Sequence, residues 1–227
     1  MNKGFTLIEI MISILITSIV LTSVYALFFS IGNNLNGIVT VSDMQHNTRS
    51  ALDCIITELK QAGSDPLDKV FSNTYHPIKV AGKNMIHFEM DVTDLSGSGD
   101  PDGIIYGTKE SIIFSLYDSG SDGDLDLGRK RDGGKNMAVS ENIELLNFYY
   151  FDKNFNLLGD SSNDIKAVLV AVLGRAATSD KSYKNFNEYS VNLPDGAKLS
   201  VFQGEGDGFK RYLLSSFVYL NNVGTND

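Results

Sequence analysis

One carboxylate, Glu9, stands at the start of a long apolar segment. From Ile10 to Ile31 the sequence has 22 residues without a charged side chain or a proline. A carboxylate inside hydrocarbon costs about 2.5–3.5 kcal/mol and usually has a partner. Two interpretations follow. Glu9 lies near the end of the segment and reaches water among lipid headgroups, or it pairs with a cation that another subunit or a freed N-terminus supplies.

Two loops rich in aspartate and glycine are the other candidates for chemistry. Ca²⁺ takes about six to eight oxygen ligands from a flexible loop. On the frame of an EF-hand loop that starts at Asp118, the second loop matches at positions 5, 7 and 9 but has Gly120 at position 3 and Arg129 at position 12. The possible ligands are Asp91, Asp94, Asp100 and Asp102 in the first loop and Asp118, Asp122, Asp124 and Asp126 in the second. The two loops could share one ion, or both could be solvated hairpin connections, since Asp and Gly favour turns. Calcium is thus a possible ligand, and no cofactor is expected to be required.

The sequence lacks the constellations of an enzyme. Its three histidines, His46, His76 and His87, are far apart and have no HExxH-like spacing. It has no G-x-S-x-G elbow and no P-loop, and Gly204–Gly208 lacks the lysine of a phosphate-binding loop. The net charge of -9 argues against nucleic acid as the main partner, because phosphate contacts need clustered Lys and Arg. We therefore predict that the protein is not an enzyme.

The element that positions Glu9 is a helix long enough to cross a membrane. The 22 apolar residues span about 33 Å as a helix, against a bilayer core of about 30 Å. Two glycines and three asparagines in Gly32–Gly37 then favour a bend or a looser segment. Beyond it one apolar face recurs at spacings of three and four, and Gly63 is a natural stop. The residues of this face are Val41, Met44, Thr48, Leu52, Ile55 and Leu59. We predict one helix over residues 5–62, with a membrane half at 5–31 and a second half that packs on a globular head.

Short alternating segments separated by Gly- and Asp-rich turns follow the helix. This pattern predicts antiparallel strands. Ile165–Leu173 is apolar on both faces, which places it in the middle of a sheet with the helix on one side. The four aromatic residues of Phe148–Phe151 are assigned to the core and to sheet packing. Other predicted strands are Met85–Met90, Ser111–Leu116, Leu146–Tyr150 and Tyr212–Leu220. The prediction is an α+β protein whose residues 63–227 form a single β-rich head.

The N-terminal residues resemble a class III signal, that of type IV prepilins. The resemblance is carried by Lys3-Gly4, then Phe5-Thr6-Leu7-Ile8-Glu9 and the apolar helix. It implies that residues 1–4 are a leader and that a prepilin peptidase cuts between Gly4 and Phe5 on the cytoplasmic side. The same enzyme would then methylate the new Phe5 amine. Glu9 would neutralise the Phe5 amine of an adjacent subunit, because two charges buried together cost far less than either alone.

Two other interpretations of the first 30 residues remain open. One is an ordinary secretory signal peptide, with Val24-Tyr25-Ala26 as a cleavage site. Against it stand the single lysine before the apolar segment, the acidic residue inside it, and its continuation through Leu27–Phe29. The other is a generic single-span anchor. All three interpretations place Lys3 in the cytoplasm and the residues beyond about 32 outside it.

The head resembles PilW-type minor pilins, which are related to the J-type pseudopilin of type II secretion. The similarity lies in Ser111–Asp118, in Met137–Tyr150 and in Asp164–Val168. The chain ends its last strand with Asn221-Asn222, where such proteins often carry an Arg-Asn pair. The resemblance implies a type IV pilin-like fold, with the long helix packed on an antiparallel sheet.

The two resemblances imply a structural subunit, a minor pilin of a type IV pilus. The alternatives are a J-type pseudopilin and a membrane-anchored module that binds calcium or another ligand outside the cytoplasm. The implied partners are other pilins and minor pilins, prepilin peptidase, the assembly ATPase, the inner-membrane assembly platform, and membrane lipid before assembly. The protein would cross the inner membrane once, with its head in the periplasm or outside, and would then join a pilus or pseudopilus at the cell surface.

Overall fold

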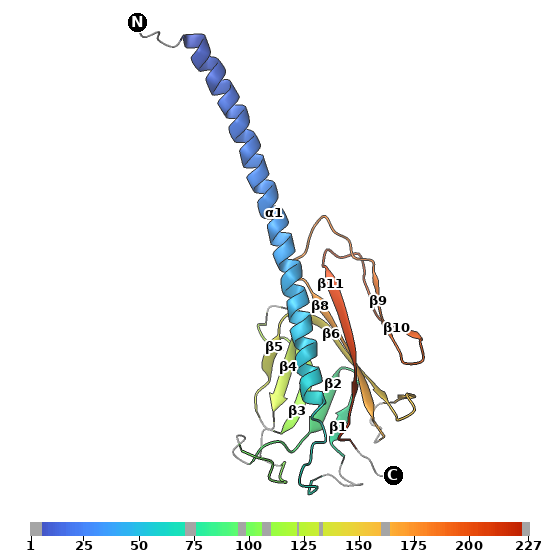
Figure 1. Cartoon of the computed structure of the whole chain (residues 1–227). Coiled ribbons are helices and arrows are strands. Elements are labelled where there is room, and N and C mark those ends of the chain that lie inside the picture. The colour runs from blue at the N-terminus through green and yellow to red at the C-terminus, as the bar shows by residue number, and fades with distance from the viewer. Residues whose placement is uncertain are drawn as a thin grey trace. The chain divides into compact units, whose positions relative to one another are not determined.

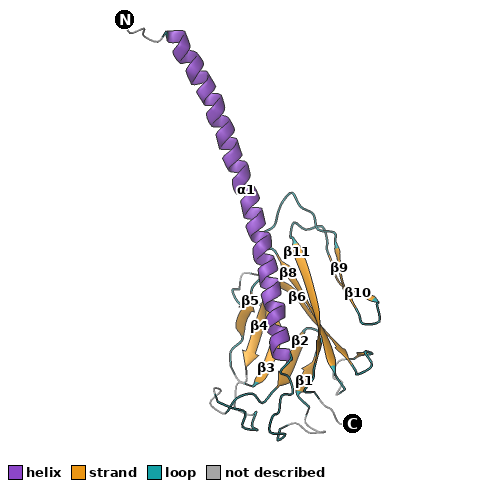
Figure 2. Cartoon of the chain, viewed as in Figure 1, coloured by secondary structure: helices purple, strands orange, loops and turns teal. Residues whose placement is uncertain are grey.

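A computed structural model describes residues 6–70, 76–94, 99–105, 110–121, 123–131, 134–159 and 164–223. Within these ranges one long helix precedes eleven strands (Figures 1 and 2). The elements are α1 (Leu7–Leu59), β1 (Ile78–Ala81), β2 (Met85–Glu89), β3 (Ser111–Tyr117), β4 (Asp126–Arg131), β5 (Met137–Ser140), β6 (Ile143–Phe151), β7 (Leu157–Leu158), β8 (Ala167–Arg175), β9 (Glu188–Asn192), β10 (Lys198–Gln203) and β11 (Arg211–Tyr219). The chain divides into two compact units, Met1–Ser42 and Asp43–Asp227.

Helix α1 is 53 residues long and continues through Gly32–Gly37, where the sequence favours a bend or a looser segment. A glycine costs about 1 kcal/mol relative to alanine, a local penalty that a long cooperative helix absorbs. The predicted helix start at residue 5 lies outside the described residues. At the other end the helix stops at Leu59, and residues 60–62 continue as a turn whose amides bond to carbonyls three or four residues earlier.

Gly63 ends this turn in a conformation that suits glycine. Its φ of 76° is left-handed, and its N–H donates to the Glu89 carbonyl at 2.9 Å. A Cβ at this position would lie 2.7 Å from the carbonyl oxygen of Asn222. The chain therefore turns away from the helix axis at the residue that the sequence indicates.

The part of α1 from Asp43 onward buries one face in the core of the head. The buried members of this face are Met44, Thr48, Ala51, Leu52, Ile55 and Leu59. They recur at spacings of three and four, as an apolar helix face does. Leu52, Ile55 and Leu59 share one hydrophobic cluster with residues of both larger sheets, so this part of the helix holds the two sheets together.

The first sheet is an antiparallel meander in the order β1-β2-β3-β4-β5. Its buried side chains include Phe88 and Phe114, whose rings lie 6.3 Å apart between centroids. β4 is also tied to the helix by charge, since Arg129 Nε donates to Glu58 Oε2 at 2.7 Å. The apolar core and this ion pair together fix the meander against α1.

The second sheet has the order β11-β8-β6-β7, and all its strands are antiparallel. β8 lies between β11 and β6, and its residues 167–174 are all buried. This confirms the prediction of a central strand that is covered on both faces. β6 also adjoins the first sheet, because Phe148 N–H donates to the Lys83 carbonyl at 2.7 Å and Tyr150 Oη to the Gly82 carbonyl at 2.8 Å.

A two-stranded hairpin, β9–β10, covers the face of the second sheet opposite the helix. It supplies Val191 to a second hydrophobic cluster with Phe151, Leu169 and other sheet residues. The aromatic run of β6 therefore alternates between the two faces. Phe148 and Tyr150 point into the core beside the helix, whereas Phe151 packs in the second cluster with Tyr149 at its border. The predicted α+β class, with a long helix on antiparallel sheets, is confirmed.

Candidate functional site

The N-terminal end of α1 carries the residues for which the sequence predicts processing and assembly. Gly4 and Phe5 lie outside the described residues, whereas Thr6 and Glu9 are described. Thr6 precedes the first helical residue, and Glu9 lies in the first turn of the helix. The structure therefore gives the geometry of Glu9 and of the residues around it.

Thr6 and Glu9 bond reciprocally as a capping box. Glu9 Oε2 accepts from the Thr6 N–H at 2.8 Å and from Thr6 Oγ1 at 2.7 Å, and the Glu9 N–H donates to Thr6 Oγ1 at 3.4 Å. A Thr-x-x-Glu spacing at a helix start satisfies amides that have no partner inside the helix. Among the described residues no donor reaches the other carboxylate oxygen, Oε1. One oxygen of Glu9 thus closes its own helix, while the second stays available to a cation.

The surface of α1 from Thr6 to Gly32 is exposed, although most of its side chains are apolar. By length and composition α1 could cross a membrane, and it is the one such helix among the described residues. Five hydroxyls within the span donate to backbone carbonyls three or four residues earlier, at 2.7–2.9 Å. They belong to Ser13, Thr17, Ser18, Thr22 and Ser23. Because these five hydroxyls are paired inside the helix, they can enter hydrocarbon without becoming unpaired donors.

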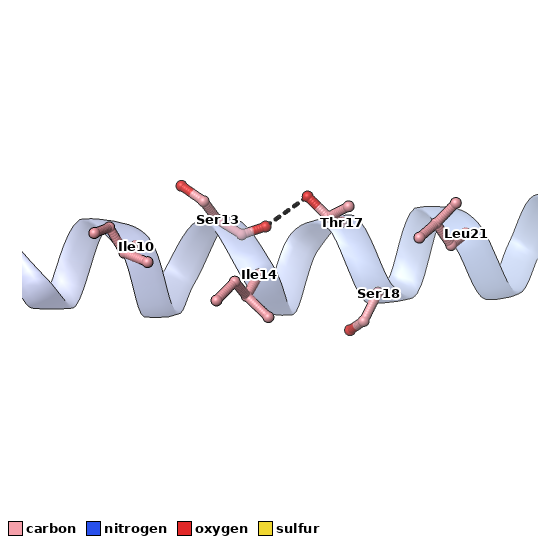
Figure 3. A pocket seen from close by; sticks show the side chains of 6 residues that line it. All are labelled: Ile10, Ser13, Ile14, Thr17, Ser18 and Leu21. Atoms are coloured by element: carbon pink, nitrogen blue, oxygen red, sulfur yellow. Dashed lines mark hydrogen bonds between the residues drawn. The ribbon is translucent and has the colours of Figure 1, made fainter.

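A shallow groove runs along this part of the helix (Figure 3). It is lined by Ile10, Ser13, Ile14, Thr17, Ser18 and Leu21. The hydroxyl of Thr17 bonds to the carbonyl of Ser13 at 2.7 Å, as the dashed line in Figure 3 marks. Small hydroxyl residues beside larger aliphatic ones let another helix approach closely, which is how helices associate in membranes.

The second acidic loop, between β3 and β4, uses its carboxylates to shape itself. Asp126 is buried, and its Oδ2 accepts from the Ser119 N–H at 3.2 Å and also from the Ser119 hydroxyl. Its Oδ1 accepts from the Asn142 N–H at 3.1 Å. Asp118 is exposed and accepts from the Gly123 N–H at 3.3 Å. Asp124 is half-buried, and Asp122 lies outside the described residues.

The first acidic loop, between β2 and β3, differs because one of its aspartates is fully buried. Asp91 has no exposed surface, and its Oδ2 accepts from the Gly103 N–H at 3.0 Å. Asp102 caps its own turn by accepting from the Ile104 N–H at 2.9 Å. Asp94 is half-buried and Asp100 is exposed. The predicted ligands in this loop therefore lie in different environments.

The described parts of the chain contain no group of three or more His, Cys, Asp or Glu side chains arranged to hold a metal ion. The predicted calcium ligands in these parts do not form such a group, and binding of calcium remains a prediction. Two residues that matter near these sites were not identified from the sequence. Thr6 could have been found from its Thr-x-x-Glu spacing, which is a capping-box signature. Glu110 gave no such signal, because it lies 19 positions from Asp91 in the sequence.

Comparison with known proteins adds a family motif and a fold. Residues 1–25 match the family model described as the prokaryotic N-terminal methylation motif. The structure is similar to that of a type IV-like pilin from Thermus thermophilus, with a TM-score of 0.50 and 12% sequence identity. The similarity covers 79% of this chain and 97% of that chain, and at this identity it concerns the fold. A search of curated proteins finds no match to the sequence.

The family motif and the fold similarity concern different features of the chain, namely its N-terminal segment and the arrangement of its helix and sheets. The methylation motif covers the leader and most of the apolar segment with Glu9, and the pilin-like fold combines the long helix with antiparallel sheets. Together they support the interpretation that the chain is type IV prepilin-like, with an N-terminal methylation motif on a pilin-like fold.

Proposed function

We propose that the protein is a minor pilin of the PilW type, a structural subunit of a type IV pilus. The observation that carries the proposal is the methylation motif at residues 1–25 on a chain with a pilin-like fold. The head supports the finer assignment through its resemblance to PilW-type proteins in β3 and in the segment of β5 and β6. The related J-type pseudopilin of type II secretion is the alternative that the tests below distinguish.

In this proposal the protein is first inserted in the inner membrane as a single-span precursor. Prepilin peptidase cuts between Gly4 and Phe5 and methylates the Phe5 amine. The apolar span then leaves the lipid and packs among the helices of other pilins, driven by the assembly ATPase and the platform protein. The five internally bonded hydroxyls support this exchange, because they need no water in either environment.

Glu9 sets the axial position of the subunit in this mechanism. Its Oε1 accepts no hydrogen bond among the described residues, and Oε2 is held by Thr6. The charged Phe5 amine of an adjacent subunit would bind this carboxylate. Pairing removes the cost of leaving either charge alone in an apolar environment, a cost of several kcal/mol per ion. Only the helix position that brings the two charges together avoids this cost.

The mass of the N-terminal fragment from the native membrane tests the proposal directly. We expect a mature chain that begins at N-methyl-Phe5, because the peptidase would remove residues 1–4. A Gly4→Val variant should keep its leader, since the resemblance places glycine before the cut. A start near Leu27 would indicate a secretory signal peptide, and an intact Met1 on the wild-type chain would indicate a simple anchor. Either result contradicts the proposal.

Deletion of the gene separates the two pilin-type assignments. A minor pilin should be found in sheared surface filaments, and its loss should reduce the number of filaments. Loss of a J-type pseudopilin should leave surface filaments unchanged and stop the export of secreted enzymes. Complementation with the wild-type chain is the control for both measurements.

A further inference from the structure

The base of the β2–β3 connection brings two carboxylates together inside the protein. Asp91 follows β2 and Glu110 precedes β3, and the Met90 N–H donates to the Glu110 carbonyl at 3.2 Å. The two side chains belong to fully buried residues, with 0% of Asp91 and 1% of Glu110 exposed. Acidic residues are almost never buried to this degree unless they are paired.

The hydrogen bonds at this base leave two buried oxygens unused. Glu110 Oε1 accepts from the N–H groups of Val92 and Thr93, at 2.5 and 2.6 Å. Asp91 Oδ2 accepts from the Gly103 N–H at 3.0 Å. Asp91 Oδ1 and Thr93 Oγ1 are buried and have no hydrogen-bond partner. Buried polar atoms are paired in the great majority of cases, so each exception needs an explanation.

The charges around Asp91 do not supply the missing partner. Burial raises the pKa of Asp91, the backbone amides of Gly103 and Asp102 lower it, and the nearby carboxylates of Glu110 and Asp65 raise it. No lysine or arginine of the described residues forms a salt bridge with Asp91. A buried ion without a counter-charge costs several kcal/mol. A positive charge from outside the chain would remove this cost.

Protonation of Asp91 would neutralise its charge, but it would satisfy the buried oxygens less completely than a metal ion would. A protonated Asp91 would need an acceptor for its O–H, and Oδ1 has no partner of either kind. The Thr93 hydroxyl would stay unsatisfied as well. A hard divalent cation instead takes carboxylate and hydroxyl oxygens as ligands and completes its shell with water. A cation in contact with both unused oxygens would give each of them a partner.

We propose that Asp91, Thr93 and Glu110 bind a hard divalent cation, Ca²⁺ or Mg²⁺, at the base of the β2–β3 connection. The site is distinct from the loop between β3 and β4, where Ser119 and Asn142 already occupy both oxygens of Asp126. Two carboxylates are few for such an ion, so we expect a dissociation constant of about 10⁻⁴–10⁻³ M, as in extracellular calcium modules. The cation would join the end of β2 to the start of β3. This proposal does not depend on the assignment as a pilin.

Thermal unfolding of the full-length protein in a non-ionic detergent tests the site. After removal of divalent ions with a chelator, titration with CaCl₂ should raise the unfolding temperature in a saturable way. A tenfold excess over the dissociation constant should give a rise of about 3–6 °C. A parallel titration with MgCl₂ identifies the preferred ion, and NaCl at equal ionic strength controls for screening.

Three variants locate the response. Asp91→Asn should abolish it, and Thr93→Val should weaken the binding. Asp118→Asn, which changes the other acidic loop, should respond like the wild type. If Asp91→Asn does not fold, calorimetric titration of the wild type and of Thr93→Val gives the same comparison.

Several results would overturn the proposal. One is a wild-type protein whose unfolding temperature and heat of mixing respond to neither ion. Another is an Asp91→Asn variant that keeps the full response. A third is a protein that does not respond to either ion but becomes more stable when Asp91 is changed to Asn, because asparagine mimics a protonated aspartate. That result would show that a proton, and not a metal ion, neutralises Asp91.

Discussion

Glu9 has two properties that substitution can separate, namely its capacity to accept hydrogen bonds and its negative charge. Its Oε2 closes the capping box with Thr6, a role that glutamine can also fill. Only a carboxylate can neutralise an amine. A comparison of Glu9→Gln with Glu9→Ala therefore distinguishes helix capping from charge pairing.

We expect Glu9→Gln and Glu9→Ala to be cleaved normally and to assemble equally poorly, because both lack the charge. Only Glu9→Ala should also fray the start of the helix. Hydrogen exchange of the detergent-solubilised chain should then show severalfold faster exchange in the first turn of that variant alone. Filament content of each variant gives the second measurement. Normal assembly of Glu9→Gln would disprove the role of the charge and leave capping as the function of Glu9.

Gly174 in β8 lies against the helix residue Thr48, and this close approach can be tested by substitution. A Cβ built there would lie 1.9 Å from Thr48 Oγ1 and 3.2 Å from Thr48 Cβ. Thr48 is fully buried, and its hydroxyl donates to the Met44 carbonyl at 2.7 Å. The threonine hydroxyl can therefore occupy this space only because residue 174 has no side chain.

We predict that Gly174→Ala lowers the free energy of unfolding by about 1–3 kcal/mol, the usual cost of overpacking a core. Thr48→Ala removes the clashing oxygen, so the double variant should recover most of this loss. Thermal unfolding of the wild type, both single variants and the double variant gives the coupling energy between the two positions. Additive effects would mean that the strand and the helix do not meet at this point.

At the scale of elements, Arg211 connects the start of β11 to β6, to β10 and to the segment that precedes β11. It donates through Nη2 to Glu144 Oε1 at 2.9 Å and through Nη1 to Asp207 Oδ1 at 2.6 Å. Its guanidinium also lies over the ring of Phe202 in β10, 4.8 Å from the centroid. The arginine side chain is only 3% exposed, so its removal leaves both carboxylates without their counter-charge. This cluster holds the β9–β10 hairpin to the sheet beside the second hydrophobic cluster.

We expect Arg211→Met to destabilise the head by about 2–3 kcal/mol. This is less than the 3–5 kcal/mol for a fully buried pair, since both carboxylates still reach solvent. Hydrogen exchange should show that β9 and β10 are deprotected before the helix is. Arg211→Lys is the matched control, and it should restore the charge but not the bidentate bonds. Uniform loss of protection across the head would contradict a local role.

The same cluster predicts how the hairpin responds to acid. The hydrogen bond from Arg211 holds the pKa of Asp207 below its ordinary value. A lowered folded pKa means that the stabilisation is complete above the ordinary aspartate value of about 3.9 and is lost as the pH falls through the lower folded value. Protection of β9 and β10 should therefore decrease below about pH 4. An Asp207→Asn variant should be less stable at neutral pH and should show a flatter response to acid in this element.

For the whole molecule, the distribution of buried residues separates the head from the membrane segment. Among the described residues, all the buried hydrophobic side chains begin at Met44, and the N-terminal unit ends at Ser42. We predict that a fragment of residues 43–227 folds without lipid and unfolds in one cooperative transition. Circular dichroism and size-exclusion chromatography in detergent-free buffer test this. An aggregated or molten fragment would show that the head needs the first unit in order to fold.

The sequence predicted the helix and the central strand well because their signals are local. A long run without charges, a recurrence of three and four from Met44 to Leu59, and a doubly apolar Ile165–Leu173 each report on burial directly. The β9–β10 hairpin was not predicted, because its strands are short and carry few large apolar residues. Its burial depends on the second sheet beneath it.

The candidate sites also differ in whether their sequence signal is local. Glu9 could be singled out because a charge stands out in an apolar segment. The pairing of Asp91 with Glu110 could not, since a loop closure brings together residues that are distant in the sequence. Of eight aspartates in two similar-looking loops, composition alone could not show that Asp91 is buried with a free oxygen while both oxygens of Asp126 are occupied.

The hydroxyls of the apolar span have a consequence for reversibility. Because Ser13, Thr17 and their neighbours bond within their own helix, the number of hydrogen bonds stays the same whether lipid tails or other helices surround the segment. Moving it between the two surroundings then changes mainly van der Waals contacts, which are individually weak. The hydrogen bonds of these hydroxyls therefore give the segment no preference between the two surroundings, and they need not be broken or remade when the segment moves in either direction.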